Sequence, residues 1–167
     1  MNVIKTKING FCIRKAEKKD AELILKYIKD LASFENELDQ VSATVPLLEE
    51  NMFDKHGAEA IIGEYNGCSV GFALFHASFS TYLAKSSMHL VDLYVEPDMR
   101  GKGFGRAMLS ALAKLAIERG CGRLEWWAHD WNEEAIRHYK KWGAKKVDFI
   151  RVYRMTGKAL VDFAETD

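Results

Sequence analysis

Proline, cysteine and net charge are all scarce in this sequence, and each shortage excludes a class of protein. The 167 residues include two prolines and no stretch rich in Pro, Gly or Ser, so no linker between domains is indicated. Lys plus Arg number 24 and Asp plus Glu number 24, which makes the formal net charge zero. A chain without excess positive charge gives no support for binding to nucleic acid or to an acidic membrane surface.

Cysteine patterns and long apolar runs are missing as well. Cys12, Cys68 and Cys121 are odd in number and widely spaced, which indicates neither a disulfide framework nor a metal site and is typical of a reducing compartment. The N-terminus lacks the apolar core of a signal peptide, and no run approaches the ~18 apolar residues of a membrane span. We therefore expect a cytoplasmic protein that binds no metal and does not enter a membrane.

What the chain does contain is the composition of a globular domain, with 48% hydrophobic and 29% charged residues. One hydrophobic core suits a chain of this length better than two. We expect a single domain over residues 1–167, with its core between about residues 11 and 156.

Local patterns predict alternating strands and helices. Apolar residues at helical spacing, together with capping residues, indicate helices over 20–33, 44–53, 104–119 and 133–142. Runs of β-forming residues indicate strands at 11–15, 58–65, 69–79, 89–95, 123–128, 145–148 and 151–155, and Asn66-Gly67 is a tight hairpin turn between two of them. This order predicts an α/β fold in which helices flank a mixed sheet.

Three glycines lie in five positions between the strand that ends near Val95 and the helix that begins near Phe104. The first amides of a helix have no internal partner, and the helix dipole adds about half a positive charge there. Glycines let a phosphate approach those amides and allow the positive φ of an anion-binding turn. The spacing matches neither a P-loop nor a dinucleotide fingerprint. By themselves the glycines leave two interpretations open, a phosphate or pyrophosphate site and a flexible corner with solvated cations.

The stretch Arg100-x-x-Gly103-x-Gly105 resembles the acetyl-coenzyme A signature of the GCN5-related N-acetyltransferases, the GNAT superfamily. The resemblance extends over nearly the whole chain. Phe11 to Arg14, Leu31 to Glu35, Leu93 to Val95 and Trp131 to Gly143 are similar to the spermidine/spermine (diamine) branch of that superfamily.

The resemblance implies an acetyl-CoA-dependent enzyme with a mostly antiparallel sheet, splayed strands at the cofactor cleft, a small primary amine such as a polyamine or diamine as acceptor, and a homodimer. Acetyl-CoA is expected at the backbone of the core strand, the glycine turn and the start of the next helix: Leu93, Tyr94, Val95, Arg100, Gly101, Lys102, Gly103, Phe104, Gly105, Arg106, Asn132 and Ala135. The acceptor is expected at Phe34, Glu35, Tyr82, Asp92 and Glu125.

Tyr139 is implied as the catalytic acid. A phenol with a pKa of about 10 can donate to a leaving thiolate at neutral pH without being ionised beforehand. Both Tyr139 and Asn132 also have structural interpretations, because Tyr139 shares a helix face with Ala135 and Ile136, and Asp130-Trp-Asn-Glu133 has the pattern of a capping box.

The chain departs from the branch before the core strand, where the usual Leu-Glu-Asp is Leu90-Val91-Asp92. The carboxylate expected to take the proton of the amine is therefore missing. Since neighbouring strand residues point to opposite faces, we expect that Asp92 cannot replace it in the same direction. A non-catalytic acyl-CoA-binding protein, or an acetyltransferase of protein lysines or N-termini, remains an alternative.

Overall fold

A computed structural model of the protein describes residues 3–166. The chain divides between Trp127 and Ala128 into two compact units. The first unit carries the sheet and the glycine turn, and the second carries the C-terminal helices. Each unit is described by itself.

The described residues of the first unit form a six-stranded sheet in the order β1-β2-β3-β4-β5-β6. Neighbouring strands are antiparallel except for β5 and β6, which are parallel. The predicted mixed sheet is therefore confirmed, and β1 is a strand that the sequence patterns did not predict. The strands are β1 Ile4–Lys5, β2 Phe11–Lys15, β3 Glu59–Tyr65, β4 Cys68–Ser80, β5 Lys85–Val95 and β6 Leu124–Trp126.

The turn predicted at Asn66-Gly67 connects β3 and β4. Both residues have positive φ, 50° and 83°, as a tight hairpin turn with the right-handed strand twist requires.

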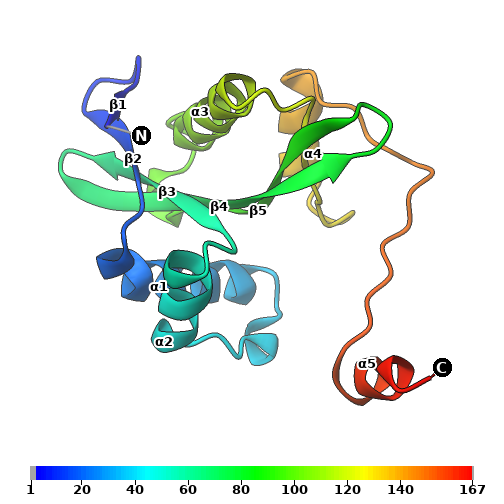
Figure 1. The fold of residues 1–167 in the computed structure, drawn as a ribbon. Coiled ribbons are helices and arrows are strands. Elements are labelled where there is room, and N and C mark those ends of the chain that lie inside the picture. The colour runs from blue at the N-terminus through cyan, green and yellow to red at the C-terminus, as the bar shows by residue number, and fades with distance from the viewer. Residues whose placement is uncertain (1–2, 167) are drawn as a thin grey trace. The chain divides into compact units, whose positions relative to one another are not determined.

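Helices cover both faces of this sheet (Figure 1). Helix α1 and the short α2 lie on one face, and α3 lies on the other. Thr44 caps α2 as predicted, because its Oγ1 accepts a hydrogen bond from the amide of Leu47, and the helix continues as a π-helical turn over Glu49–Asp54. The helices are α1 Ala21–Phe34, α2 Val45–Leu48 and α3 Phe104–Glu118, with 3-10 turns at Lys18–Asp20, Leu38–Gln40 and Pro97–Met99.

Two apolar layers hold the helices to the sheet. On the α1 face, the Tyr27 ring packs against Phe72 and Tyr94, with ring centroids 5.6 and 5.5 Å apart. On the α3 face, Phe104 stacks on Phe11 at 4.2 Å. Complete burial of one such side chain stabilises the fold by roughly 1.5–3 kcal/mol. Phe104 is the first residue of α3, so this contact anchors the helix at the end that follows the glycine turn.

The second unit contains α4, Glu133–Lys141, and α5, Gly157–Ala164. The two strands predicted at 145–148 and 151–155 are wrong for this chain, since residues 144–156 form no helix or strand. A strand needs a neighbour for its hydrogen bonds, and none pairs with this segment in the described chain. Helix α5 lies in a segment for which no helix was predicted. No helix within residues 3–166 has the length and apolar character needed to cross a membrane.

Candidate active site

The glycine turn presents a row of unpaired backbone amides. Gly101 and Gly103 have φ values of +76° and +85°, which other residues rarely adopt, and Gly103 is the N-cap of α3. Within residues 3–166, the amides from Gly101 to Arg106 donate no hydrogen bond. A side chain added at Gly101 would meet no atom within 4 Å, so the space over the turn is open. The turn can therefore accept an anionic group at the positive end of the helix dipole.

The cations around the turn differ in what they contact. Arg100 turns away from the amides, because its Nε donates to the carbonyl of Val95 at 3.0 Å and its guanidinium lies over the rings of Phe34 and Tyr94. Lys102 Nζ donates to the carbonyl of Asp98 at 3.1 Å. Arg106 is exposed on the first turn of α3. Arg100 thus links α1 to the end of β5 in this structure. The feature of the turn that favours an anion is therefore its row of open amides and not the side chain of Arg100.

Strand β5, which precedes the glycine turn, is paired along the whole of one edge but along only part of the other. β4 pairs with β5 along its length up to Val95, whereas in the described chain β6 pairs with β5 only from Met88 to Leu90. β6 ends at Trp126, opposite Leu90, so within the described residues of the first unit no strand pairs with this side of β5 beyond Leu90. The backbone of Leu93, Tyr94 and Val95 is therefore unpaired on that side and can pair with an extended ligand.

A β-bulge at Val91 reverses the direction of the strand side chains. Leu90 pairs with Phe75, but Asp92 pairs with Leu74, so one residue of β5 has no partner in β4. Phe75 and Leu74 are consecutive and point to opposite faces, and Leu90 and Asp92 must do the same. The expectation that Asp92 points away from position 91 is therefore wrong. Because neighbouring strand residues alternate, Val91 points to the face opposite Leu90, which is the α1 face. The bulge places Asp92 on the α1 face as well.

Asp92 lies in an environment that favours its neutral form. Burial, with a further contribution from the charge of Glu35, raises the pKa of Asp92 to about 6. Glu35 is the C-cap residue of α1, and Phe34 precedes it. The structure thus brings two of the predicted acceptor residues, Asp92 and Glu35, together at the C-terminal end of α1. Two adjoining carboxylates at one site favour a cationic ligand, which would relieve their repulsion.

Comparisons with known proteins agree with this geometry. Residues 25–144 match the model of the acetyltransferase (GNAT) family. The chain is 33% identical over 164 residues to a thialysine N-epsilon-acetyltransferase from Bos taurus, covering 91% of this chain and 96% of the relative. It belongs to the GNAT family.

A human relative and a solved structure extend the match. The chain is 31% identical over 170 residues to the spermidine/spermine N(1)-acetyltransferase-like protein 1 of Homo sapiens, covering 95% of this chain and 24% of that protein. The integron cassette protein VCH_CASS6 from the mobile metagenome of V. cholerae has a similar structure, with a TM-score of 0.79, 26% identity and coverage of 94% of this chain and 99% of the other. These likenesses place this GNAT enzyme in the spermidine/spermine acetyltransferase-like branch.

Two predicted acceptor residues of this GNAT chain lie away from Asp92. Tyr82 is 97% exposed in the turn between β4 and β5, beyond Lys85, which is seven residues or about 23 Å along the strand from Asp92. Glu125 lies on β6 opposite His89 of β5, and its carboxylate contacts Arg123 Nε at 3.0 Å. The structure gives neither residue a place beside Asp92 and Glu35.

Helix α4 carries the remaining predicted residues. Asn132 is the N-cap of α4, since its Oδ1 accepts a hydrogen bond from the amide of Ala135 at 3.2 Å, which agrees with the structural interpretation of this residue. Tyr139 is half-buried, and desolvation raises the pKa of its phenol. The phenol therefore stays protonated at neutral pH, which is the state that a proton donor needs.

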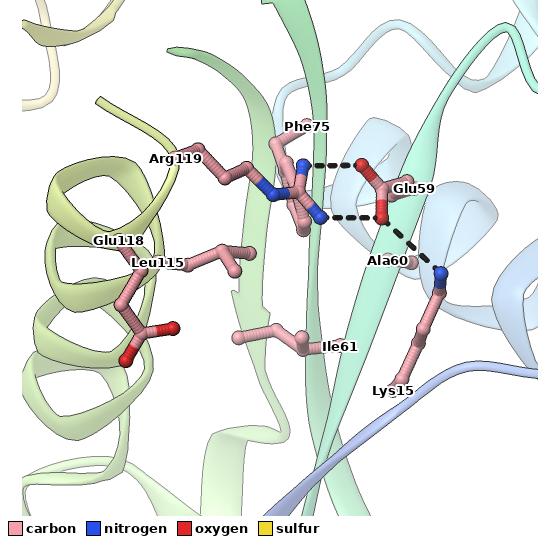
Figure 2. Close-up of a pocket in the computed structure, with 8 residues that line it drawn as sticks. All are labelled: Lys15, Glu59, Ala60, Ile61, Phe75, Leu115, Glu118 and Arg119. Carbon is pink, nitrogen blue, oxygen red and sulfur yellow. Dashed lines mark hydrogen bonds and ion pairs between the residues drawn. The ribbon is translucent and has the colours of Figure 1, made fainter. Parts of the chain in front are cut away.

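A small cavity of about 200 Å³ lies elsewhere in the first unit (Figure 2). Figure 2 shows Glu59 held between Arg119 and Lys15 at its rim. Its helical lining residues, Leu115 and Glu118, come from the last turn of α3. The 15 residues of this helix span roughly 22 Å, so the cavity is separate from the glycine turn.

The bulge and the open amides are features that sequence patterns missed or left undecided. A β-bulge leaves no pattern in the sequence of a single strand, because it is defined by how that strand pairs with its neighbour. The order of strand, turn and helix left open whether the amides of the turn are available, and the structure supplies the positive φ angles that expose them.

Proposed function

We propose that this N-acetyltransferase transfers the acetyl group of acetyl-CoA to a primary amine of a small cationic molecule, such as a polyamine, a diamine or a lysine-like amino acid. The observation that carries the acceptor class is the pair of carboxylates, Asp92 and Glu35, beside the end of β5 that β6 leaves unpaired. The relatives named for thialysine and for spermidine/spermine acetylation, both amines, support the same class.

Acetyl-CoA supplies the acetyl group as a thioester. We assign its pyrophosphate to the unpaired amides from Gly101 to Arg106, where the open space over Gly101 admits phosphate oxygens. We assign its pantetheine arm to the free edge of β5 at Leu93, Tyr94 and Val95, because extended amide groups bind there as an additional strand would. An amide near Leu93 or Tyr94 would then stabilise negative charge on the thioester oxygen.

The acceptor amine must lose a proton before it attacks. Alkyl amines have a pKa of about 10.4 and are almost wholly charged at pH 7. We propose that Asp92 binds the ammonium group and receives its proton, directly or through water, in place of the Glu missing at Val91. The raised pKa of Asp92, about 6, makes it a better base than an ordinary aspartate. Glu35 would hold a second charge of the same amine.

Tyr139 is proposed as the acid that donates a proton to the departing thiolate of coenzyme A. Its half-buried phenol has a raised pKa and stays protonated. Asn132 would contribute to acetyl-CoA binding mainly by fixing the start of α4, as its cap hydrogen bond with Ala135 indicates. No cysteine is needed as an acyl carrier, so the transfer would be direct, within a ternary complex.

We also propose a reducing, cytoplasmic compartment for the enzyme. The proposal rests on the cysteine pattern, because three widely spaced cysteines indicate no disulfide framework.

A panel of amines tests the function. The enzyme is incubated with acetyl-CoA and with spermidine, putrescine, ornithine, thialysine or a lysine peptide, and the release of free coenzyme A thiol is followed. Amine-dependent release with small diamines or polyamines supports the proposal. Release with the peptide alone would favour a protein acetyltransferase. Binding of acetyl-CoA without amine-dependent release would show a non-catalytic binding protein.

A further inference from the structure

The α1 face of the sheet carries a row of polar side chains across β4, β5 and β6. His76 of β4 pairs with His89 of β5, and their ring centroids are 5.2 Å apart. Glu125 of β6 lies opposite His89 on the other side. Leu74, which packs in the core against α1, is two residues from His76. Because residues two apart in a strand share a face, the row lies on the same face as Asp92.

The polar row contains one ion pair that is open to solvent. Arg123 Nε contacts the carboxylate of Glu125 at 3.0 Å, so the two side chains share this face, and they are 44% and 41% exposed. An exposed pair of this kind contributes little to stability, so a ligand can rearrange it at small cost. Burial and the neighbouring His76 lower the pKa of His89. The His89 ring is therefore neutral at pH 7 and does not neutralise Glu125.

Beside this ion pair is a buried hydroxyl that has no hydrogen-bond partner in the described part of the chain. Ser87 is two residues before His89, so it points to the same face, and its exposed fraction is 0%. Met88, the next residue, donates its amide to the carbonyl of Arg123 at 3.0 Å, which places Ser87 next to Arg123. Since buried polar groups in folded proteins are nearly always paired, this hydroxyl favours a polar ligand at the ion pair.

The separation between Asp92 and the ion pair matches the length of an amino acid such as lysine. Asp92 is three residues beyond His89 on β5 and Glu125 is one strand away, so Asp92 and Glu125 are roughly 11 Å apart. The two nitrogens of an extended lysine lie roughly 7 Å apart, and a hydrogen bond of about 2.8 Å at each end spans the rest. Val91, which is 49% exposed between the two ends, offers an apolar surface for the methylene groups.

We propose that Arg123 and Glu125 bind the α-carboxylate and the α-ammonium group of an amino-acid acceptor whose side-chain amine lies at Asp92. This inference rests on the proposed function, because it takes Asp92 as the site of the reacting amine. A guanidinium can hold a carboxylate by two parallel hydrogen bonds, and Glu125 is beside it for the ammonium group. A polyamine would place its second charge at Glu35 and has no group for Arg123. The site therefore favours a lysine-like amino acid over a polyamine.

Pairs of amines that differ only in the carboxylate test the proposal. Cadaverine is lysine without its α-carboxylate, and putrescine is ornithine without it. We expect kcat/KM to be about tenfold or more higher for each amino acid than for its diamine, since the diamine leaves Arg123 without a partner from the ligand. In Arg123→Gln this ratio should fall to about one, through a higher KM for the amino acids with kcat almost unchanged.

Two further variants separate this effect from a general loss of charge. Arg119→Gln is the matched control, because it removes an arginine from another exposed ion pair, with Glu59, and should keep the ratio of the parent. Glu125→Gln should weaken both members of each pair, because the amino acid and the diamine both carry a second ammonium group.

Isothermal titration in the presence of saturating coenzyme A makes the same comparison without turnover. Lysine should bind more tightly than cadaverine, and Arg123→Gln should remove the difference. An enzyme that acetylates none of these amines would contradict the proposed function, while the titration would still decide whether Arg123 selects the carboxylate. A parent that binds each diamine as well as its amino acid would overturn the proposal. So would an Arg123→Gln variant that keeps the preference of the parent.

Discussion

The carboxylate of Glu35, at the end of α1, lies close enough to Asp92 on β5 to add to the rise in the pKa of Asp92. Burial is the larger cause, and together they bring that pKa to about 6. Burial holds the aspartate near the midpoint of its titration at mildly acidic pH, and a cationic amine between the two residues would restore its charge.

Replacement of Asp92 by Asn should have opposite effects on turnover and on stability. Turnover should fall about 100-fold, because the proton acceptor is lost. The parent should lose activity as pH falls through about 6, where Asp92 becomes protonated. Its folded pKa is raised, so Asp92 binds more protons in the folded state between about pH 4 and 6, and the free energy of unfolding should decrease as pH rises through that window.

The same variant should therefore be more stable than the parent at pH 8, by on the order of 1–3 kcal/mol. Urea melts at pH 4.5 and 8 give the stability, and thiol release gives the activity. Equal turnover of Asp92→Asn and parent would remove Asp92 from the mechanism.

Substitution of Val91 by Glu should raise turnover with polyamines several-fold. Val91 is 49% exposed on the α1 face, and a carboxylate there would add a second proton acceptor next to Asp92. Val91→Gln is the matched control, since it has the same shape without the charge. If Glu and Gln at this position give equal rates, the missing carboxylate does not limit the reaction.

Substitution of Tyr139 by Phe should lower kcat by about 100-fold while the KM for both substrates changes little, because the phenol is proposed to act on the leaving sulfur. The raised pKa of Tyr139 predicts that the parent keeps this donor through mildly alkaline pH. Steady-state kinetics across pH, with circular dichroism to verify the fold, give the comparison. A variant with full activity would show that Tyr139 is only a packing residue.

Substitution of Gly101 by Ala should weaken acetyl-CoA binding about tenfold or more, because the residue must keep φ at +76° for the amides to face the ligand. Gly120→Ala is the control: its φ is +70°, a new side chain meets no atom within 4 Å, and it lies past the far end of α3. Both variants should lose about 1 kcal/mol of stability from backbone strain. Isothermal titration with coenzyme A should show weaker binding for Gly101→Ala than for Gly120→Ala. Equal losses of affinity in the two variants would contradict a phosphate site at the turn.

Substitution of Glu59 by Gln should lower stability by about 1 kcal/mol without affecting turnover. Glu59 accepts a hydrogen bond from Arg119 Nη2 at 2.9 Å and contacts Lys15 Nζ at 3.3 Å, and the Arg119 hydrogen bonds are the main cause of its lowered pKa. The contribution to stability is present above the ordinary carboxyl pKa and is lost as pH falls through the folded value. Thermal melts of variant and parent should therefore differ at pH 7 and converge in acid. A decrease in turnover would connect the cavity in Figure 2 to catalysis.

Sequence patterns predicted the first unit well, because its signals are local. Asn66-Gly67, the glycine turn and the helix from Phe104 each depend on backbone preferences or periodicity within a few residues. The start of α4 at Glu133 and its cap at Asn132 also follow from local signals, since a helix is predicted over 133–142 with Asn132 inside a capping pattern.

The sequence by itself determined the family, the order of strands and helices from β2 to α4, and the position of a glycine turn that can bind an anion, since these depend on short-range chemistry. The tertiary structure decided which carboxylates meet. Strand alternation directs Asp92 away from position 91, and only the pairing of β5 with β4 shows the bulge that brings both positions to the α1 face near Glu35. It also decided that residues 145–148 and 151–155 form no strand in a single chain, because β propensity becomes structure only where another strand completes its hydrogen bonds.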